Sequence, residues 1–271
     1  MSPNRAGAIG LAGFAFWAVA SFVTAQETVH LYAAGSLRAA MTEVGEEFTR
    51  ASGAAVQGEF SASGLLRDRI AKGERADVFA SANMEHPQSL AQSGRAGPVM
   101  RFARNRLCAL VGPGVSVTPE TLLDRMLDPG LKLGTSTPKS DPAGDYAWQV
   151  FEKAERERPG AFARLSGKAL KLVGAADSPP PPRDRSLYGQ LMAEKKADIF
   201  LTYCTNAALA QKEEPALALV ALPPELAVGA DYGMTVLVGG GPAAERFARF
   251  VMSERGQEIL ARHGFSSPSA P

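Results

Sequence analysis

The chain has 271 residues, of which 45% are hydrophobic, and a formal net charge of +1 at pH 7. This length allows two lobes of ordinary domain size, each with its own hydrophobic core. The near-neutral charge, with Lys and Arg spread along the chain, gives no support for nucleic-acid binding. The sequence shows no heptad pattern and no internal repeats.

The first 25 residues are predicted to be a signal peptide. Arg5 supplies a positive charge, residues 6–23 are apolar and small, and Val23-Thr24-Ala25 fits a small-x-small cleavage site. A retained membrane anchor is the alternative, but the small residues and the cleavage site favour removal. No Cys stands at the cleavage point, which argues against lipid anchoring. We therefore expect an exported, periplasmic protein whose mature chain begins near Gln26.

The next stretch predicts an anion site. Residues 29–33 form an apolar, β-prone run, and Ala34, Gly35 and Ser36 separate this run from a segment with helical spacing. A strand that turns through small residues into a helix leaves backbone N–H groups free, and the helix dipole adds positive charge there. Ser36 can donate its hydroxyl to a ligand, or it can simply cap the helix.

A second copy of this arrangement follows. A small, hydroxyl-rich turn, Phe60-Ser61-Ala62-Ser63-Gly64, lies between an extended run at 55–60 and a helical pattern at 65–70. In open α/β sheets, ligands bind at the carboxyl ends of neighbouring strands, where two such turns can converge. The pair suggests a small anion held by N–H and O–H groups.

The rest of the chain alternates strand and helix signals, as in α/β proteins. Strands are predicted at 76–80, 107–111, 131–134, 170–173, 197–203, 220–222 and 235–238. Helices are predicted to end near Gly94, to begin near Pro119 and to cover about 146–154, 186–194 and 243–263. Loops are predicted at 135–144, at the stiff proline run 179–182 and in a polar turn at 203–206.

The two cysteines, Cys108 and Cys204, both lie inside apolar, strand-like runs. In an oxidising compartment an even pair is a plausible disulfide, and buried free thiols are the alternative. Their spacing fits no metal motif.

Enzyme signatures are missing from the sequence. The three histidines, His30, His86 and His263, stand without a Gly-x-Ser-x-Gly elbow or a His-Glu-x-x-His motif. We expect no catalytic residues and no enzymatic activity.

Five motifs in order give the chain a family resemblance. It resembles the periplasmic molybdate-binding proteins of ABC importers, which belong to the two-lobed solute-binding superfamily. The motifs cover nearly all of the mature chain: Tyr32-Ala-Ala-Gly-Ser36-Leu, Phe60-Ser-Ala-Ser63-Gly-Leu-Leu, Gly73-Glu-Arg-Ala-Asp77-Val-Phe-Ala-Ser-Ala-Asn83, Asp141-Pro-Ala-Gly144-Asp-Tyr-Ala147 and Ala197-Asp198-Ile-Phe-Leu-Thr-Tyr203.

The resemblance implies an α/β fold of the type II periplasmic binding protein class. Each lobe would be a mixed, mostly parallel sheet flanked by helices, with the ligand cleft between the lobes. Residues 26–105 and 231–271 would form lobe 1, and residues 106–230 would form lobe 2. The superfamily's strand arrangement would also place Cys108 beside Cys204, as a disulfide within lobe 2.

The resemblance also implies a ligand set. Ser36 and Ser63 match serines that give hydroxyl and amide donors, and Tyr203 matches a tyrosine whose hydroxyl reaches the anion. Ala143 matches a residue that donates its backbone N–H, and Arg185 falls where the family supplies one more N–H. The family usually has a small or β-branched residue at the last position. Arg185 could therefore pair with a neighbouring acid, face solvent, or add positive charge that favours a larger or carboxylated anion.

The expected function is capture of a tetrahedral oxyanion, molybdate or tungstate, by lobe closure. No cofactor and no metal cation are expected, because molybdenum would arrive as the oxyanion. The expected partner is a membrane-embedded ABC permease, with the binding protein as a monomer. The alternatives are a sulfate-like anion, a small carboxylate or ferric ion. Ferric-ion binding proteins share the architecture, but this chain has no adjacent tyrosine pair.

Overall fold

The computed structural model describes residues 27–178, 182 and 185–269. The predicted signal peptide and most of the proline run therefore lie outside the described residues. Within the described ranges, none of the helices is both long enough and apolar enough to cross a membrane.

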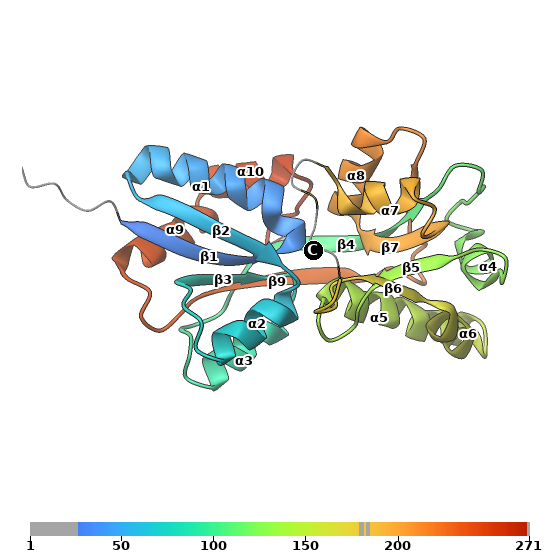
Figure 1. Ribbon diagram of the computed structural model, residues 1–271, viewed down its shortest axis with the longest axis horizontal. Coiled ribbons are helices and arrows are strands. Elements are labelled where there is room, and N and C mark those ends of the chain that lie inside the picture. Colours follow the sequence, from blue (N-terminus) through green and yellow to red (C-terminus); the bar gives the residue numbers. More distant parts are fainter. Residues whose placement is uncertain (1–26, 179–181, 183–184, 270–271) are drawn as a thin grey trace, which may run out of the picture.

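One half of the molecule is built on three parallel strands that lie side by side. These strands are β2 (Ala55–Ser61), β1 (Thr28–Ala34) and β3 (Val78–Ser81). One face is covered by α1 (Arg38–Ser52), α9 (Pro242–Met252) and α10 (Glu254–Arg262), and the other by α2 (Ser63–Ala71) and α3 (Glu85–Gln92) (Figure 1).

The other half repeats this plan with its own parallel strands. Here β5 (Leu133–Ser136) lies between β6 (Leu170–Val173) and β7 (Ile199–Tyr203). The helices are α4 (Leu122–Leu127), α5 (Pro142–Glu157) and α6 (Ala161–Lys168) on one side, and α7 (Leu187–Ala193) and α8 (Cys204–Glu213) on the other (Figure 1). Strand β8 (Ala218–Ala221) pairs with β4.

Two antiparallel strands run between the halves. The first, β4 (Met100–Val111), pairs with β9 (Gly229–Val236) from Met100–Met234 to Arg106–Gly229. Its last residues pair instead with β7 and β8. The strand order is β2-β1-β3-β9-β4-β7-β5-β6, so β4 and β9 connect the two lobes. This arrangement is the two-lobed α/β fold that the sequence predicts.

Apolar residues at helical spacing fix α1 on its sheet. Met41, Val44 and Phe48 are buried, and the Phe48 ring meets the Phe247 ring of α9 edge-on, with centroids 5.2 Å apart. Burying one such side chain contributes about 1.5–3 kcal/mol. The packing holds the N-terminal end of α1 at the carboxyl end of β1.

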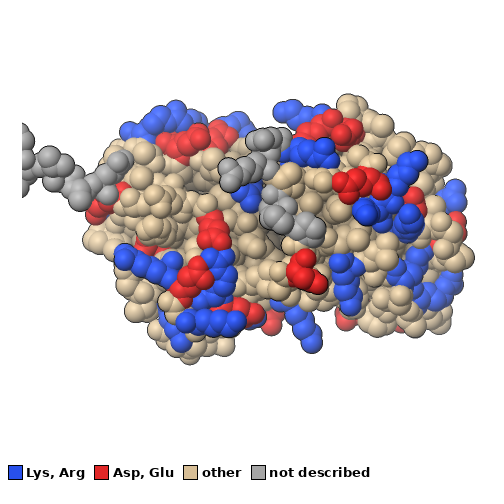
Figure 2. Space-filling view, viewed as in Figure 1, with Lys and Arg blue, Asp and Glu red and all other residues tan. Residues whose placement is uncertain are grey.

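Charged side chains of both signs share the surface. On the face shown in Figure 2, Lys and Arg are interspersed with Asp and Glu. Arg101 and Arg104 on β4 both pair with Asp231 on β9, with N–O distances of 3.1 and 2.9 Å. These pairs link the two strands that connect the lobes.

The structure differs from several of the predicted elements. The C-terminal helix is two helices, because Ser253 ends α9 and caps α10 by accepting the Gly256 N–H at 3.2 Å. The polar turn after Tyr203 is the first turn of α8, and α6 was not predicted. Strand β4 is longer than the predicted strand at 107–111, because its first half pairs with β9.

The two cysteines are joined in the structure. Cys108 lies on β4 opposite Thr202 of β7, and Cys204 follows Thr202 by two residues. The Cα atoms are 4.9 Å apart, within the usual range for a disulfide. The bond ties β4 to the start of α8.

Candidate functional site

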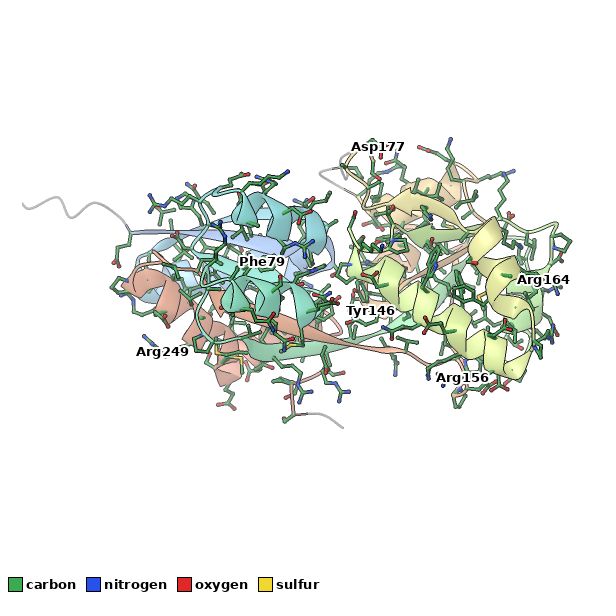
Figure 3. All side chains as sticks on the ribbon, turned by 90° about the horizontal axis from the view of Figure 1, so that it is seen from below. Phe79, Tyr146, Arg156, Arg164, Asp177 and Arg249 are labelled. Atoms are coloured by element: carbon green, nitrogen blue, oxygen red, sulfur yellow. A yellow bond between two sulfur atoms is a disulfide. The ribbon has the colours of Figure 1, made fainter. Side chains whose placement is uncertain are left out.

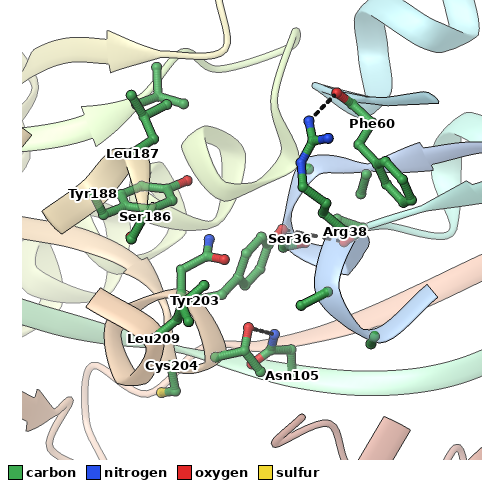
Figure 4. A pocket seen from close by; sticks show the side chains of 18 of the residues that line it. Ser36, Arg38, Phe60, Asn105, Ser186, Leu187, Tyr188, Tyr203, Cys204 and Leu209 are labelled. Carbon is green, nitrogen blue, oxygen red and sulfur yellow. Dashed lines mark hydrogen bonds between the residues drawn. The ribbon is translucent and has the colours of Figure 1, made fainter. Parts of the chain in front are cut away.

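A cleft of about 1450 Å³ opens between the two lobes. The first lobe lines it with Ser36, Arg38 and residues 61–63, and the second lobe with Asp141, residues 174–176, residues 185–188 and residues 203–206. Figure 4 shows Tyr203 and Ser36 near its centre, with Arg38 above them. The cleft is large compared with common small-molecule pockets, which hold about 300–1,000 Å³.

Ser36 lies where β1 gives way to a helix. The strand ends at Ala34, and a short 3-10 turn, Gly35–Leu37, leads into α1. The Ser36 hydroxyl makes no capping bond and instead lies 2.9 Å from the hydroxyl of Tyr232. The turn therefore presents a side-chain hydroxyl and helix-start amides to the cleft.

Ser63 occupies the matching position at the start of α2. Its side chain is 1% exposed, and its Oγ accepts the backbone N–H of Ala82 at 3.1 Å. A serine hydroxyl that accepts one bond can still donate its own proton. Ser63 therefore keeps a donor for a ligand while it fixes the end of β3.

Tyr203 brings a third hydroxyl from the other lobe. It ends β7, is 2% exposed, and packs against Tyr232 and Tyr146 with ring centroids 5.5 and 6.3 Å away. Its hydroxyl donates a long bond of 3.5 Å to the carbonyl of Ala82. Figure 3 shows Tyr146 on α5 where the lobes meet. Burial raises the pKa of all three phenols, so they remain protonated donors.

Ala143 and Asp141 form the start of α5. Ala143 is fully buried, and its N–H donates to Oδ1 of Asp141 at 3.1 Å. Asp141 is the N-cap residue and lines the cleft. The amide assigned to the ligand by the sequence is therefore held by a carboxyl group in this structure.

Arg185 and Arg38 are two of the arginines that line the cleft. Arg185 is exposed and precedes Ser186, whose Oγ caps α7 by accepting the Gly189 N–H at 3.3 Å. Arg38 stacks over the ring of Phe60, 5.0 Å from its centroid, and donates to the Phe60 carbonyl at 3.2 Å. Desolvation lowers the pKa of Arg38, but a guanidinium stays charged.

The lobes touch directly beside the cleft. The N–H of Gly64 on α2 donates to the carbonyl of Ser140 across the cleft at 2.8 Å. A Cβ on Gly64 would lie 2.5 Å from the Lys139 oxygen and 2.7 Å from the Ser140 oxygen, so a side chain has no room there. The Lys139 backbone has a φ of 70°, and its N–H donates to the Asp145 carboxylate at 2.8 Å. The two lobes are thus in direct backbone contact at Gly64 and Ser140.

Four of the five predicted ligand residues line the cleft in the structure. Ser36, Ser63, Arg185 and Tyr203 all line the cleft, whereas Ala143 lies behind Asp141. The sequence assigned no site role to Tyr232, Asn105, Arg38 or Asp141. Asn105 donates to Thr205 at 2.9 Å and to Tyr232 at 3.4 Å, so it joins the same network. Only Asp141 had a local signal, as an Asp-Pro pair at a helix start.

The cleft offers neutral donors. Among the described residues, no group of three or more His, Cys, Asp or Glu side chains could hold a metal ion. Hydroxyl and amide donors at helix starts suit an anion. The fold and this cleft define a two-lobed solute-binding protein.

The chain belongs to the family of bacterial extracellular solute-binding proteins, whose profile matches residues 29–266. It is 36% identical over 206 residues to the Pasteurella multocida protein PM1146, covering 75% of this chain and 85% of that protein. It is 29% identical over 246 residues to the molybdate-binding protein ModA of Mycobacterium tuberculosis, covering 89% and 85%. Its fold is similar to the periplasmic molybdate-binding protein of Azotobacter vinelandii, with a TM-score of 0.72, 18% identity and coverage of 89% and 100%.

Proposed function

We propose that this protein is the substrate-binding component of an ABC importer and captures a tetrahedral oxyanion, molybdate or tungstate, by lobe closure. The observation that carries the proposal is the pair of serine turns, at Ser36 and Ser63, that faces Tyr203 in one cleft. The similarity to molybdate-binding relatives supports the choice of anion.

The hydration of the anion explains why a site of this kind needs many donors. A tetrahedral dianion is strongly hydrated, so a dry site must replace its water with many donors. Neutral N–H and O–H groups at helix starts can do this and still allow release. Donors from both lobes stabilise the closed form over the open one, and a permease can sense that difference.

The proposed ligand set has five members. Ser36 and Ser63 donate hydroxyl and amide protons, Tyr203 donates its hydroxyl, and Ala143 and Arg185 donate backbone N–H groups. Ala143 can serve only when Asp141 releases its amide. The charge of Arg185 adds to that of Arg38 at the cleft.

The alternatives are other ligands of the same cleft. A sulfate-like anion would use the same donors, and a small carboxylate would benefit from Arg38 and Arg185. Ferric ion needs anionic ligands, but among the described residues no group of three or more His, Cys, Asp or Glu side chains could hold a metal ion. The cleft therefore favours an anion over ferric ion.

The proposal places the mature protein in the periplasm, as a monomer that delivers its ligand to a membrane-embedded permease. Residues 1–25 would be removed near Ala25. Lobe 1 would comprise residues 26–105 and 231–271, and lobe 2 residues 106–230. The packing of α9 and α10 against α1 supports this division.

Calorimetry with molybdate and tungstate tests the function. Ser36→Ala removes one charge-assisted hydrogen bond, so the free energy of binding should weaken by about 1.5–3 kcal/mol. The corresponding loss of affinity is roughly 10- to 150-fold. Ser166→Ala is the control, because Ser166 bonds only carbonyls of its own helix, α6.

A thermal-shift screen with molybdate, tungstate, sulfate, phosphate and small carboxylates identifies the ligand class. A ligand that binds only the folded state raises the melting temperature by mass action. Unchanged molybdate affinity in Ser36→Ala would show that the site is wrongly assigned. A shift with a carboxylate alone, abolished by Arg185→Ala, would replace the oxyanion by that carboxylate.

A further inference from the structure

A carboxyl group lies among the donors of the cleft. Asp141 lines the cleft and holds the Ala143 amide at 3.1 Å. The loop after β6 packs directly on it, since a Cβ on Gly174 would lie 2.5 Å from the Asp141 Cβ. Asp141 is therefore partly buried at the place where the second lobe would meet a bound anion.

The groups around Asp141 do not neutralise it. Tyr188 from α7 and Tyr203 from β7 both interact electrostatically with the carboxyl, and Asp145 lies one turn further along α5. In the described part of the chain, no Lys, Arg or His lowers the pKa of Asp141. Desolvation, the largest effect, and the charge of Asp145 together raise this pKa to about 6, although the Ala143 amide and Ser136 lower it.

More distant charges act on Asp145 or lie at the cleft. Glu85 from α3 raises the pKa of Asp145, whereas the Lys139 backbone and ammonium lower it. Arg38 and Arg185 line the same cleft, as do Arg104, Arg106, Lys212, Arg262 and His263. None of these side chains contributes to the shifted pKa of Asp141.

A buried hydroxyl also lies beside Asp141, next to Tyr188. Ser136 from β5 is 0% exposed, and its Oγ has no hydrogen-bond partner. It lies near enough to Asp141 to lower the carboxyl pKa, yet it forms no hydrogen bond in this structure. An unpartnered buried donor is costly unless a ligand or water accepts its proton.

We propose that the cleft binds its oxyanion together with one proton, held between the Asp141 carboxyl and an oxygen of the anion. The ionised carboxylate repels a dianion and holds the Ala143 amide. The protonated carboxyl donates to the anion and is a weaker acceptor, so it releases that amide. Asp141 is thus a specificity-determining residue for the proposed function, on which this inference rests.

The proton has two possible sources. An anion that carries a proton near neutral pH, such as hydrogen phosphate, brings it along. Molybdate and sulfate are dianions at that pH, so the proton must come from solvent. A carboxylate in the site therefore separates oxyanions of equal charge and shape by the proton they carry.

Proton uptake by the parent protein tests the proposal without any substitution. Molybdate binding is measured by calorimetry at about pH 7.5 in buffers of different ionisation enthalpy. We expect uptake of close to one proton, with affinity falling about tenfold per pH unit above pH 7. Binding without proton uptake would overturn the linkage and leave the proposed function standing. Failure to bind any of these oxyanions would overturn both.

The variant Asp141→Asn assigns the proton to this side chain. It keeps an acceptor for the Ala143 amide and removes the charge, so it should bind molybdate without proton uptake. Asp198→Asn is the matched control, because Asp198 accepts the Lys132 N–H at 2.7 Å outside the cleft, and its proton uptake should equal that of the parent. Uptake that persists in Asp141→Asn would overturn the assignment.

A comparison of phosphate with sulfate at about pH 8 separates the two proton sources. The parent should prefer phosphate and take up no proton with it, whereas Asp141→Asn should lose that preference. Equal preferences in the parent and the variant would count against Asp141 as the selective group.

Discussion

The imidazole of His86 shows how one buried residue can set the response of the protein to acid. His86 is 5% exposed, and its Nε2 has no hydrogen-bond partner. Burial, helped by the nearby charge of Arg67, lowers its pKa from 6.5 to about 4. Because the unfolded chain takes up a proton between these values and the native protein does not, stability falls as the pH falls from about 6.5 to 4.

We predict that His86→Leu weakens this acid sensitivity. The full effect of the shifted pKa is about 3 kcal/mol at low pH, so the variant should lose about 2–3 kcal/mol less than the parent between pH 7 and 4.5. Urea unfolding at both pH values measures the difference. Asp141 acts in the opposite direction, since its raised pKa costs stability as the pH rises from 3.8 to about 6. An unchanged loss in His86→Leu would refute the prediction.

The residues that sequence could predict are those with a local signature. Ser36 and Ser63 each lie between a strand and a helix, and that pattern is visible within a dozen neighbouring residues. Tyr232 meets Ser36 from a strand 196 positions further along the chain, so no spacing rule connects them. Arg38 looked like an ordinary exposed helix residue, because its stacking on Phe60 depends on how β2 lies beside β1.

Among the elements, the break between α9 and α10 depends on one side chain. The Ser253 hydroxyl accepts the Gly256 N–H at 3.2 Å and donates to the Phe250 carbonyl at 2.6 Å. It therefore closes one helix and opens the next. The apolar spacing continues through the break, which is why the sequence predicted a single helix.

Ser253→Ala should lower the free energy of unfolding by about 0.5–2 kcal/mol, as expected for a lost helix cap. The melting temperature should fall by about 2–4 °C for each kcal/mol lost, measured by circular dichroism. Ser267→Ala serves as the control, because Ser267 is exposed and bonds only Ser269. Equal melting temperatures in the two variants would argue that the cap is dispensable.

The sequence predicted a helix or strand correctly where its apolar residues recur at the period of that element and are buried in the structure. The run at 29–33 became β1, Thr28–Ala34, because it is apolar and central in its sheet. The first half of β4 was missed because Arg101, Arg104 and Arg106 interrupt the apolar pattern. Two of these arginines face Asp231 on the partner strand, a contact that no local pattern reveals.

For the whole molecule, the tightest approach described between the lobes is at Gly64. Its N–H meets the Ser140 carbonyl at 2.8 Å, and a Cβ there would lie 2.5 Å from a backbone oxygen of the other lobe. We predict that Gly64→Ala keeps both lobes folded but prevents full closure. Molybdate affinity should fall at least about tenfold, because the ligand then gains less from the second lobe.

Small-angle X-ray scattering checks this prediction. The radius of gyration of Gly64→Ala should stay at its ligand-free value when molybdate is added, whereas that of the parent should shrink. Gly167→Ala on α6 is the matched control, because a Cβ there meets nothing within 4 Å. If the variant closes like the parent, the contact at Gly64 does not control closure.

The strand order could be expected only through the family resemblance. Periodicity predicts strands and helices, but it does not say that β9 inserts between β3 and β4. For β9 to lie there, the chain must pass from the first lobe into the second and then return to the first at residues 229–236. The exact lobe boundaries, at residues 105 and 231, stay a prediction.

The position of β9 also has a consequence for how the chain folds. The first lobe holds β3 and β4 apart until residues 229–236 arrive between them, so its sheet is incomplete while most of the chain is being made. Pairing residues 100–106 with residues 229–234 closes a very long loop, which makes folding slow. A nascent chain that cannot finish its first lobe stays unfolded for longer.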